Sequence, residues 1–119
     1  MGVMKGDLKE PIKKILDFRN ARKWKQFHNQ KDMAISLSLE AAEVLEHFQW
    51  KSKEEVEEYI KTHKEHIGEE LADVFYWILL MSHDLKIDII DALDKKMKKN
   101  AEKYPVSKAK GRHDKYNKL

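Results

Sequence analysis

The chain has 119 residues, a formal net charge of +3, 41% hydrophobic residues and 38% charged residues. This length suits one domain with one core, and a composition with only four glycines and two prolines favours an all-α fold. The sequence contains no cysteine, which excludes disulfides and thiolate metal sites.

A membrane protein or a secreted protein is not expected from this sequence. The longest apolar run, residues 74–81, is far shorter than the roughly 20 residues that a membrane span needs. Residues 1–10 contain no apolar segment like that of a signal peptide. We therefore expect a cytoplasmic protein.

The first half of the chain is expected to form two helices. Asp7, followed by Glu10, is a candidate N-cap for a helix that runs to about Trp24. Residues 24–31, WKQFHNQK, lose the helical period and are interpreted as a bend or loop. Asp32 is then a plausible N-cap for a second helix to Phe48, and its apolar stripe consists of Met33, Leu37, Ala41, Val44, Leu45 and Phe48.

Two capping boxes follow. Ser52 with Glu55 is expected to open a short acidic helix to about residue 60, and Thr62 with Glu65 to open a third helix that ends near residues 84–85.

A last helix is predicted from Asp88 to Pro105. Residues 1–104 would then form an antiparallel four-helix bundle, completed by oligomerisation. Residues 105–119 would form a basic tail that is partly flexible or packed on a neighbouring subunit.

Two pairs of acids stand out because of their spacing. Glu70 and Asp73 lie three apart in the nearly all-apolar stretch of residues 66–81, and Glu40 and Glu43 have the same spacing. On a helix each pair shares one side, so two facing helices would bring four carboxylates together. Such acids raise one another's pKa unless a cation joins them, and oxygen ligands select Mg²⁺ or Mn²⁺. The plainer alternative is solvated surface charge.

Aromatic residues near these acids have two interpretations. Trp24, Trp50 and Trp77 either pack in the core or offer a stacking platform to a nucleobase. Their position beside the acids favours stacking for Trp24 and Trp50 and leaves both readings open for Trp77. His28 and His47 are interpreted as ordinary packed or exposed histidines.

Several segments together resemble a known family. The acid pattern Glu40-x-x-Glu43 and Glu70-x-x-Asp73 occurs with RKWKQFH at residues 22–28, SLEAAEVLEHFQW at 38–50, EELADVFYWILL at 69–80 and KMKKNAEKYP at 96–105. In these segments the chain is similar to the MazG-like all-α nucleoside triphosphate pyrophosphohydrolases, within the branch that includes dCTP pyrophosphatase.

The resemblance implies an enzyme of nucleotide-pool house-cleaning. It would cleave a (deoxy)nucleoside triphosphate, dCTP or a modified pyrimidine deoxynucleotide, to the monophosphate and pyrophosphate. Glu40, Glu43, Glu70 and Asp73 would be catalytic ligands of Mg²⁺, with Mn²⁺ as the alternative, and one glutamate, such as Glu40, would instead activate water. The resemblance also implies a dimer or tetramer.

Substrate contacts are implied by the same resemblance. Trp24, His28 and Trp50 would wall the base pocket, and Trp77 stands where a tyrosine is expected, which bears on base preference. Phosphate or sugar contacts would come from the last helix, with weaker candidates elsewhere: Lys96, Asn100, Lys103 and Tyr104, then Lys31, Arg112, Lys115 and Tyr116.

Two other functions fit the residues. The basic end, residues 95–118, suits a helical interaction module that binds nucleic acid, although the resemblance implies a nucleotide substrate and no nucleic-acid partner. A nucleotide sensor without catalysis would use the same scaffold.

Overall fold

A computed structural model describes residues 8–118, and all regular structure within that range is helical. The elements, in chain order, are α1 (Lys9–Ala21), the 3₁₀ turn η2 (Lys25–Phe27), α2 (Gln30–Glu46), α3 (Lys53–Asp84), α4 (Ile89–Lys103), α5 (Val106–Ala109) and the 3₁₀ turn η3 (Tyr116–Lys118). The predicted all-α class is confirmed.

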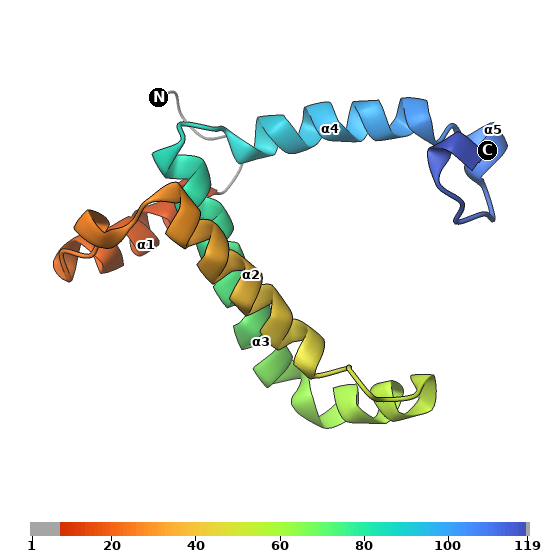
Figure 1. The fold of residues 1–119 in the computed structure, drawn as a ribbon, viewed down its shortest axis with the longest axis horizontal. Helices are drawn as coiled ribbons and strands as arrows, with labels where there is room; N and C mark the ends of the chain where they lie inside the picture. Colours follow the sequence, from red (N-terminus) through yellow and green to blue (C-terminus); the bar gives the residue numbers. More distant parts are fainter. Residues whose placement is uncertain (1–7, 119) are drawn as a thin grey trace.

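The centre of the molecule is an antiparallel pair of helices, α2 and α3, with α1 packed across one end of α3 (Figure 1). Ile12 of α1 and Leu79 of α3 are buried against each other. Arg19 of α1 is also buried, and its guanidinium donates to Asp84 at the end of α3 over 2.7 and 2.9 Å. This apolar contact and the ion pair fix α1 onto α3.

The helix starts follow local capping, with some shifts from the prediction. Asn29, and not Asp32, caps α2, because its side chain accepts from the Asp32 backbone N–H at 2.9 Å. Asp88 caps α4 as predicted. The predicted cap of α1, Asp7, lies outside the described residues, and α1 ends at Ala21, before Trp24.

The two helices predicted between residues 52 and 85 are one. The capping box of Ser52 and Glu55 is formed, but α3 then continues without a break to Asp84. Thr62 does not cap a second helix; its hydroxyl instead donates to the Tyr59 carbonyl inside α3 at 3.4 Å. Figure 1 shows that α3 bends in this first part rather than ending there.

The fourth long helix, α4, extends away from the α2–α3 pair (Figure 1). The radius of gyration is 17.9 Å, whereas a compact chain of this length would have about 13–14 Å. Leu93 and Met97 of α4 remain 53% and 55% exposed. One chain therefore does not close a four-helix bundle. The predicted boundary at residues 104–105 stays a prediction; Lys103 ends α4, and Pro105 precedes α5.

None of the helices between residues 8 and 118 has both the length and the apolar character needed to cross a membrane.

Candidate functional site

Three carboxylates converge between α2 and α3. Glu40 and Glu43 lie one turn apart on α2, and one carboxylate oxygen of each lies within 4.8 Å of the other and of an oxygen of Asp73 on α3. Burial raises the pKa of Glu40, and contact with Glu43 and the charges of Asp73 and Glu70 raise it further. Glu40 Oε2 is buried without a hydrogen-bond partner among the described residues. A bound cation would offset the repulsion between these carboxylates.

Burial differs between the two acids of α3. The side chain of Glu70 is only 16% exposed, but Asp73 is exposed, so the expectation that both are stranded in an apolar environment holds for Glu70 alone. The reason is that Asp73 borders an open pocket between α1 and α3.

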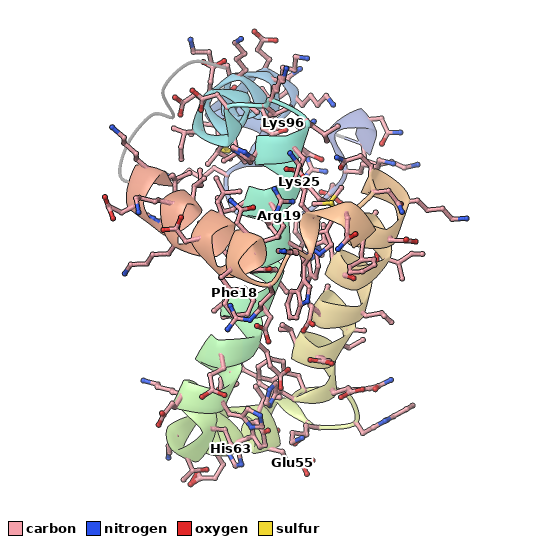
Figure 2. All side chains as sticks on the ribbon, turned by 90° about the vertical axis from the view of Figure 1, so that its left-hand side faces the viewer. Phe18, Arg19, Lys25, Glu55, His63 and Lys96 are labelled. Atoms are coloured by element: carbon pink, nitrogen blue, oxygen red, sulfur yellow. The ribbon has the colours of Figure 1, made fainter. Side chains whose placement is uncertain are left out.

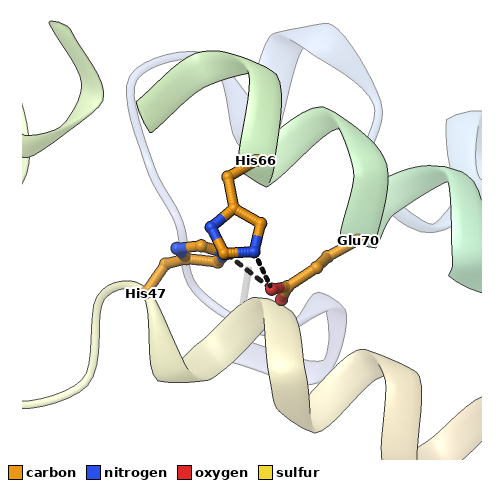
Figure 3. A group of neighbouring side chains, drawn as sticks. All are labelled: His47, His66 and Glu70. Atoms are coloured by element: carbon orange, nitrogen blue, oxygen red, sulfur yellow. Dashed lines mark ion pairs between the residues drawn. The ribbon is translucent and has the colours of Figure 1, made fainter. Parts of the chain in front are cut away.

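Glu70 is engaged by histidines rather than by the other carboxylates. Its Oε1 lies 3.0 Å from His47 Nε2 and 3.5 Å from His66 Nε2 (Figure 3). The predicted cluster of four acids is thus three acids with Glu70 beside them, close enough for its charge to raise the pKa of Glu40. Sequence reasoning missed His66 and treated His47 as ordinary, although His66 and Glu70 have the i,i+4 spacing that brings side chains together.

An aromatic pocket opens next to the carboxylates, with a volume of about 420 Å³. Its lining consists of Lys14, Ile15, Phe18, Trp24, Asp73, Tyr76 and Trp77. Phe18 meets Trp24 edge-on at 5.5 Å between ring centroids, and Tyr76 meets Trp77 edge-on at 5.1 Å. Burial raises the pKa of the Tyr76 hydroxyl. Asp73 belongs both to this lining and to the carboxylate cluster.

Two aromatic residues of the pocket, Phe18 and Tyr76, were not predicted from the sequence. Phe18 lies beside Arg19 on α1 (Figure 2), and the turn after α1 brings Trp24 back to it. The packing of α1 on α3 brings Phe18 to Tyr76, at 6.3 Å between ring centroids. Tyr76 had a local signal, because it follows Asp73 by three residues and so shares its side of α3.

The predicted base-pocket residues are only partly brought together. Trp24 and Trp77 line the pocket, and His28 packs edge-on against Trp77 at 5.5 Å. Burial and the nearby Arg19 guanidinium lower the pKa of His28. Lys31 is exposed in the first turn of α2.

Trp50 does not join this pocket within one chain. It follows α2, is 92% exposed and lies beyond the helix end opposite to Trp24. A helix of 17 residues spans about 25 Å, so within one chain Trp50 does not wall the pocket that Trp24 lines, and its predicted role in the base pocket stays a prediction.

The predicted phosphate contacts on α4 also lie apart from the carboxylates. α4 extends away from the α2–α3 pair (Figure 1). The predicted contacts lie on this helix or directly after it: Lys96, Asn100, Lys103 and Tyr104. Lys96 borders an apolar groove with Phe75 and Leu93. In the tail, Arg112 pairs with Asp114 at 2.8 Å and Lys115 is exposed, while the side chain of Tyr116 lies outside the described part.

The chain is similar to proteins of one family. A model of the MazG-like family matches residues 35–119. Two mammalian proteins named dCTP pyrophosphatase 1 align over 113 residues and 92% of this chain: the protein from Mus musculus is 33% identical, with 66% of its length covered, and that from Bos taurus is 31% identical, with 67% covered. The chain thus spans about two thirds of the length of these curated relatives.

A solved structure agrees with this relationship. The crystal structure of a pyrophosphatase from Archaeoglobus fulgidus superposes with a TM-score of 0.80 at 36% sequence identity, over 88% of this chain and 98% of that one. The family match covers more than half of the sequence, including all four predicted acids. The chain therefore belongs to the MazG-like family.

Proposed function

We propose that this protein is a Mg²⁺-dependent nucleotide pyrophosphohydrolase. It would cleave a (deoxy)nucleoside triphosphate, preferably dCTP or a modified pyrimidine deoxynucleotide, to the monophosphate and pyrophosphate. The proposal rests on one observation: Asp73 belongs to the carboxylate cluster and also lines the aromatic pocket. A base in the pocket would place its phosphates beside the acids.

The residues of the cluster fit Mg²⁺. They offer only carboxylate oxygens, the ligands that this hard ion prefers, and Mg²⁺ is usually held through a few carboxylates together with water and phosphate oxygens. Glu40 adds a buried oxygen without a hydrogen-bond partner among the described residues, and burial together with the neighbouring acids raises the pKa of its carboxyl group. Glu43 and Asp73 are exposed and would face an incoming triphosphate.

In the reaction, the chain's own residues would position the substrate and the attacking water, and would accept a proton from that water. When bound, Mg²⁺ would neutralise part of the negative charge on the phosphate oxygens. Glu40, the more buried acid, would orient the attacking water and accept its proton, a task that a raised pKa suits. Trp24 and Trp77 would hold the base by contact with its faces or edges.

The relatives support the reaction class and the base preference. Those named dCTP pyrophosphatase 1 share about a third of their aligned residues with this chain. Trp77, which replaces an expected tyrosine, lines the pocket and makes it more apolar. The missing tyrosine hydroxyl bears on which base the pocket prefers.

A panel of all common deoxynucleoside and ribonucleoside triphosphates, incubated with the protein and Mg²⁺ and assayed for pyrophosphate, tests the proposal. We expect turnover, fastest with dCTP or a modified form of it. If the folded protein releases no pyrophosphate from any of these nucleotides, the proposed enzymatic activity is refuted. Tight binding without product would instead indicate a nucleotide sensor, and salt-sensitive binding of oligonucleotides a nucleic-acid module.

Replacing a pocket aromatic should weaken substrate binding. Stacking on one aromatic side chain contributes about 1–3 kcal/mol per base, so Trp24→Ala should raise KM by about 5- to 150-fold with a small change in kcat. Steady-state kinetics with the best substrate measures this. Phe27→Ala removes an aromatic that is 66% exposed outside the pocket and should leave KM unchanged. Equal effects of the two variants would contradict the pocket assignment.

We also propose that the protein works as a homo-oligomer, a dimer or a tetramer. Phe75 of α3 and Leu93 of α4 line an apolar groove and are 43% and 53% exposed in the single chain. Burial of such side chains against a second copy would be favourable. Sedimentation velocity should therefore give at least twice the mass of one chain, and a monomer at micromolar concentration would contradict this.

A further inference from the structure

The ion pair between Arg19 and Asp84 extends to a third side chain, His28. Arg19 Nη1 donates to Asp84 Oδ2 at 2.7 Å and lies 3.4 Å from His28 Nδ1, while Nη2 donates to Asp84 Oδ1 at 2.9 Å. The Arg19 side chain is only 2% exposed. Since His28 directly follows the η2 turn, one buried guanidinium connects α1, the end of α3 and the segment that leads into α2.

The contact with Arg19 determines which nitrogen of the His28 ring carries the proton. A guanidinium has only N–H donors and stays charged in proteins, so it cannot accept a hydrogen bond. His28 Nδ1 is therefore the acceptor in this pair. A histidine whose Nδ1 accepts is neutral and has its proton on Nε2. A proton on Nδ1 would instead turn two N–H groups toward each other.

The surroundings of the ring favour the same neutral state. Burial lowers the pKa of His28 most, the Arg19 guanidinium lowers it further, and the Asp84 carboxylate raises it by a smaller amount. Both oxygens of Asp84 accept from Arg19, and Lys25 of η2 adds a second positive charge near this carboxylate. Asp84 therefore holds the guanidinium in place, and the guanidinium in turn acts on the imidazole.

The second ring nitrogen of His28 is open to a ligand. Nε2 forms no hydrogen bond with the described side chains, yet it is not one of the buried polar atoms that lack a partner there. The ring meets Trp77 edge-on at 5.5 Å between centroids, and Trp77 lines the aromatic pocket. An N–H donor beside this pocket suits an acceptor atom of a nucleobase, a carbonyl oxygen or a ring nitrogen.

We propose that Arg19, held by Asp84, is a positioning residue that fixes His28 as a neutral imidazole with its proton on Nε2, so that the ring offers the substrate base a hydrogen-bond donor without a charge. The identity of the ligand rests on the proposed function, whereas the state of the ring requires no turnover. An uncharged donor favours a base with an acceptor atom in reach. An imidazolium would also attract any triphosphate through its charge, so the neutral ring supports selection between bases.

Long-range ¹H–¹⁵N NMR spectra of the full wild-type chain test the state of the ring directly. At neutral pH we expect His28 Nδ1 to carry no proton and Nε2 to carry one, and the titration midpoint of the ring to lie below the ordinary value of 6.5. His28→Gln removes one set of imidazole signals and so assigns them. A proton on Nδ1 at neutral pH, or a midpoint at or above 6.5, would overturn the proposal.

Two variants of the ion pair separate the electrostatic role from a structural one. Both break the same pair, yet they should move the titration midpoint of His28 in opposite directions. Arg19→Met removes the repelling charge and leaves the attracting Asp84 carboxylate, so the midpoint should rise by about 1 pH unit or more. Asp84→Asn removes the attracting charge and keeps the guanidinium, so the midpoint should fall. Circular dichroism verifies the helices.

Shifts in the same direction in both variants would show that the pair affects His28 only through the packing of α1, and would refute the positioning role. The wild-type spectra decide the question even if one variant fails to fold. A neutral ring with its proton on Nε2 in a protein that releases no pyrophosphate would refute the proposed enzyme but not the state of His28. Turnover with a charged His28 at neutral pH would refute this inference alone.

The positioning role also predicts how base selection depends on pH. In the wild type, the ratio of kcat/KM between the best and the poorest nucleotide of the panel should stay constant from about pH 7.5 to about pH 6, because His28 remains neutral. In Arg19→Met this ratio should fall as the ring becomes charged. His28→Ala should raise KM for the best nucleotide by about 2- to 10-fold with little change in kcat, because one hydrogen bond to the base is lost. An unchanged KM would contradict the donor role of His28.

Discussion

Asp73→Asn should lower kcat by at least about 100-fold while leaving the helices intact. The substitution keeps the shape of the side chain but removes one carboxylate from the cluster with Glu40 and Glu43. A metal ion contributes several kcal/mol of charge stabilisation in phosphoryl transfer, and each 1.36 kcal/mol corresponds to a factor of ten in rate. Pyrophosphate release at saturating substrate and Mg²⁺ measures the effect.

The same variant should be no less stable than the wild type in the absence of Mg²⁺. Asp73 is exposed, and its charge adds to the repulsion that raises the pKa of Glu40. Mg²⁺ should raise the thermal midpoint of the wild type more than that of the variant. A metal ion stabilises the folded state only to the extent that it binds, and the variant should bind it more weakly. Glu57→Gln removes an exposed acid elsewhere on α3 and serves as the matched control. Wild-type turnover in Asp73→Asn would end the metal-site assignment.

Helix boundaries could be predicted where local capping decides them. Ser52 with Glu55 predicted the start of α3, and Asp88 predicted the start of α4. Thr62 with Glu65 has the same pattern but lies inside α3, where the Thr62 hydroxyl bonds to a carbonyl three residues back. A capping box at a helix start and a Thr-x-x-Glu pattern inside a helix look alike in sequence. They are distinguished by whether the preceding residues are themselves helical, as they are before Thr62.

The candidate site could be predicted as far as single helices determine it. The spacing of Glu40 with Glu43 placed both carboxylates on one side of α2, and Asp73 faces them from α3. The position of the Glu70 side chain depends on His47 from the other helix, which no periodicity reveals. In the same way, the resemblance implies that Trp24 and Trp50 both wall the base pocket, although the length of α2 separates them within one chain.

Arg19→Met should lower the free energy of unfolding by about 3–5 kcal/mol, the usual cost of breaking a buried ion pair by removing one partner. The Arg19 side chain is 2% exposed and that of Asp84 is 14% exposed, so the variant leaves a mostly buried carboxylate without its cation. The pair also links α1 to the end of α3. Urea denaturation at neutral pH measures the loss. Lys13→Met breaks an exposed pair with Asp17 on the same α1 helix and should lower the free energy of unfolding far less than Arg19→Met does.

The stability difference between Arg19→Met and the wild type should also depend on pH in a defined direction. The hydrogen bonds from Arg19 lower the pKa of Asp84 below its usual value of 3.8. Because the folded-state pKa is the lower one, the stability that the pair contributes is complete above 3.8 and is lost as pH falls from there through the folded-state pKa. The gap between wild type and variant should therefore be largest at neutral pH and shrink below about pH 4. A gap that stays constant down to acid pH would show that Arg19 stabilises α1 through packing of its apolar stem, and not through the charge on Asp84.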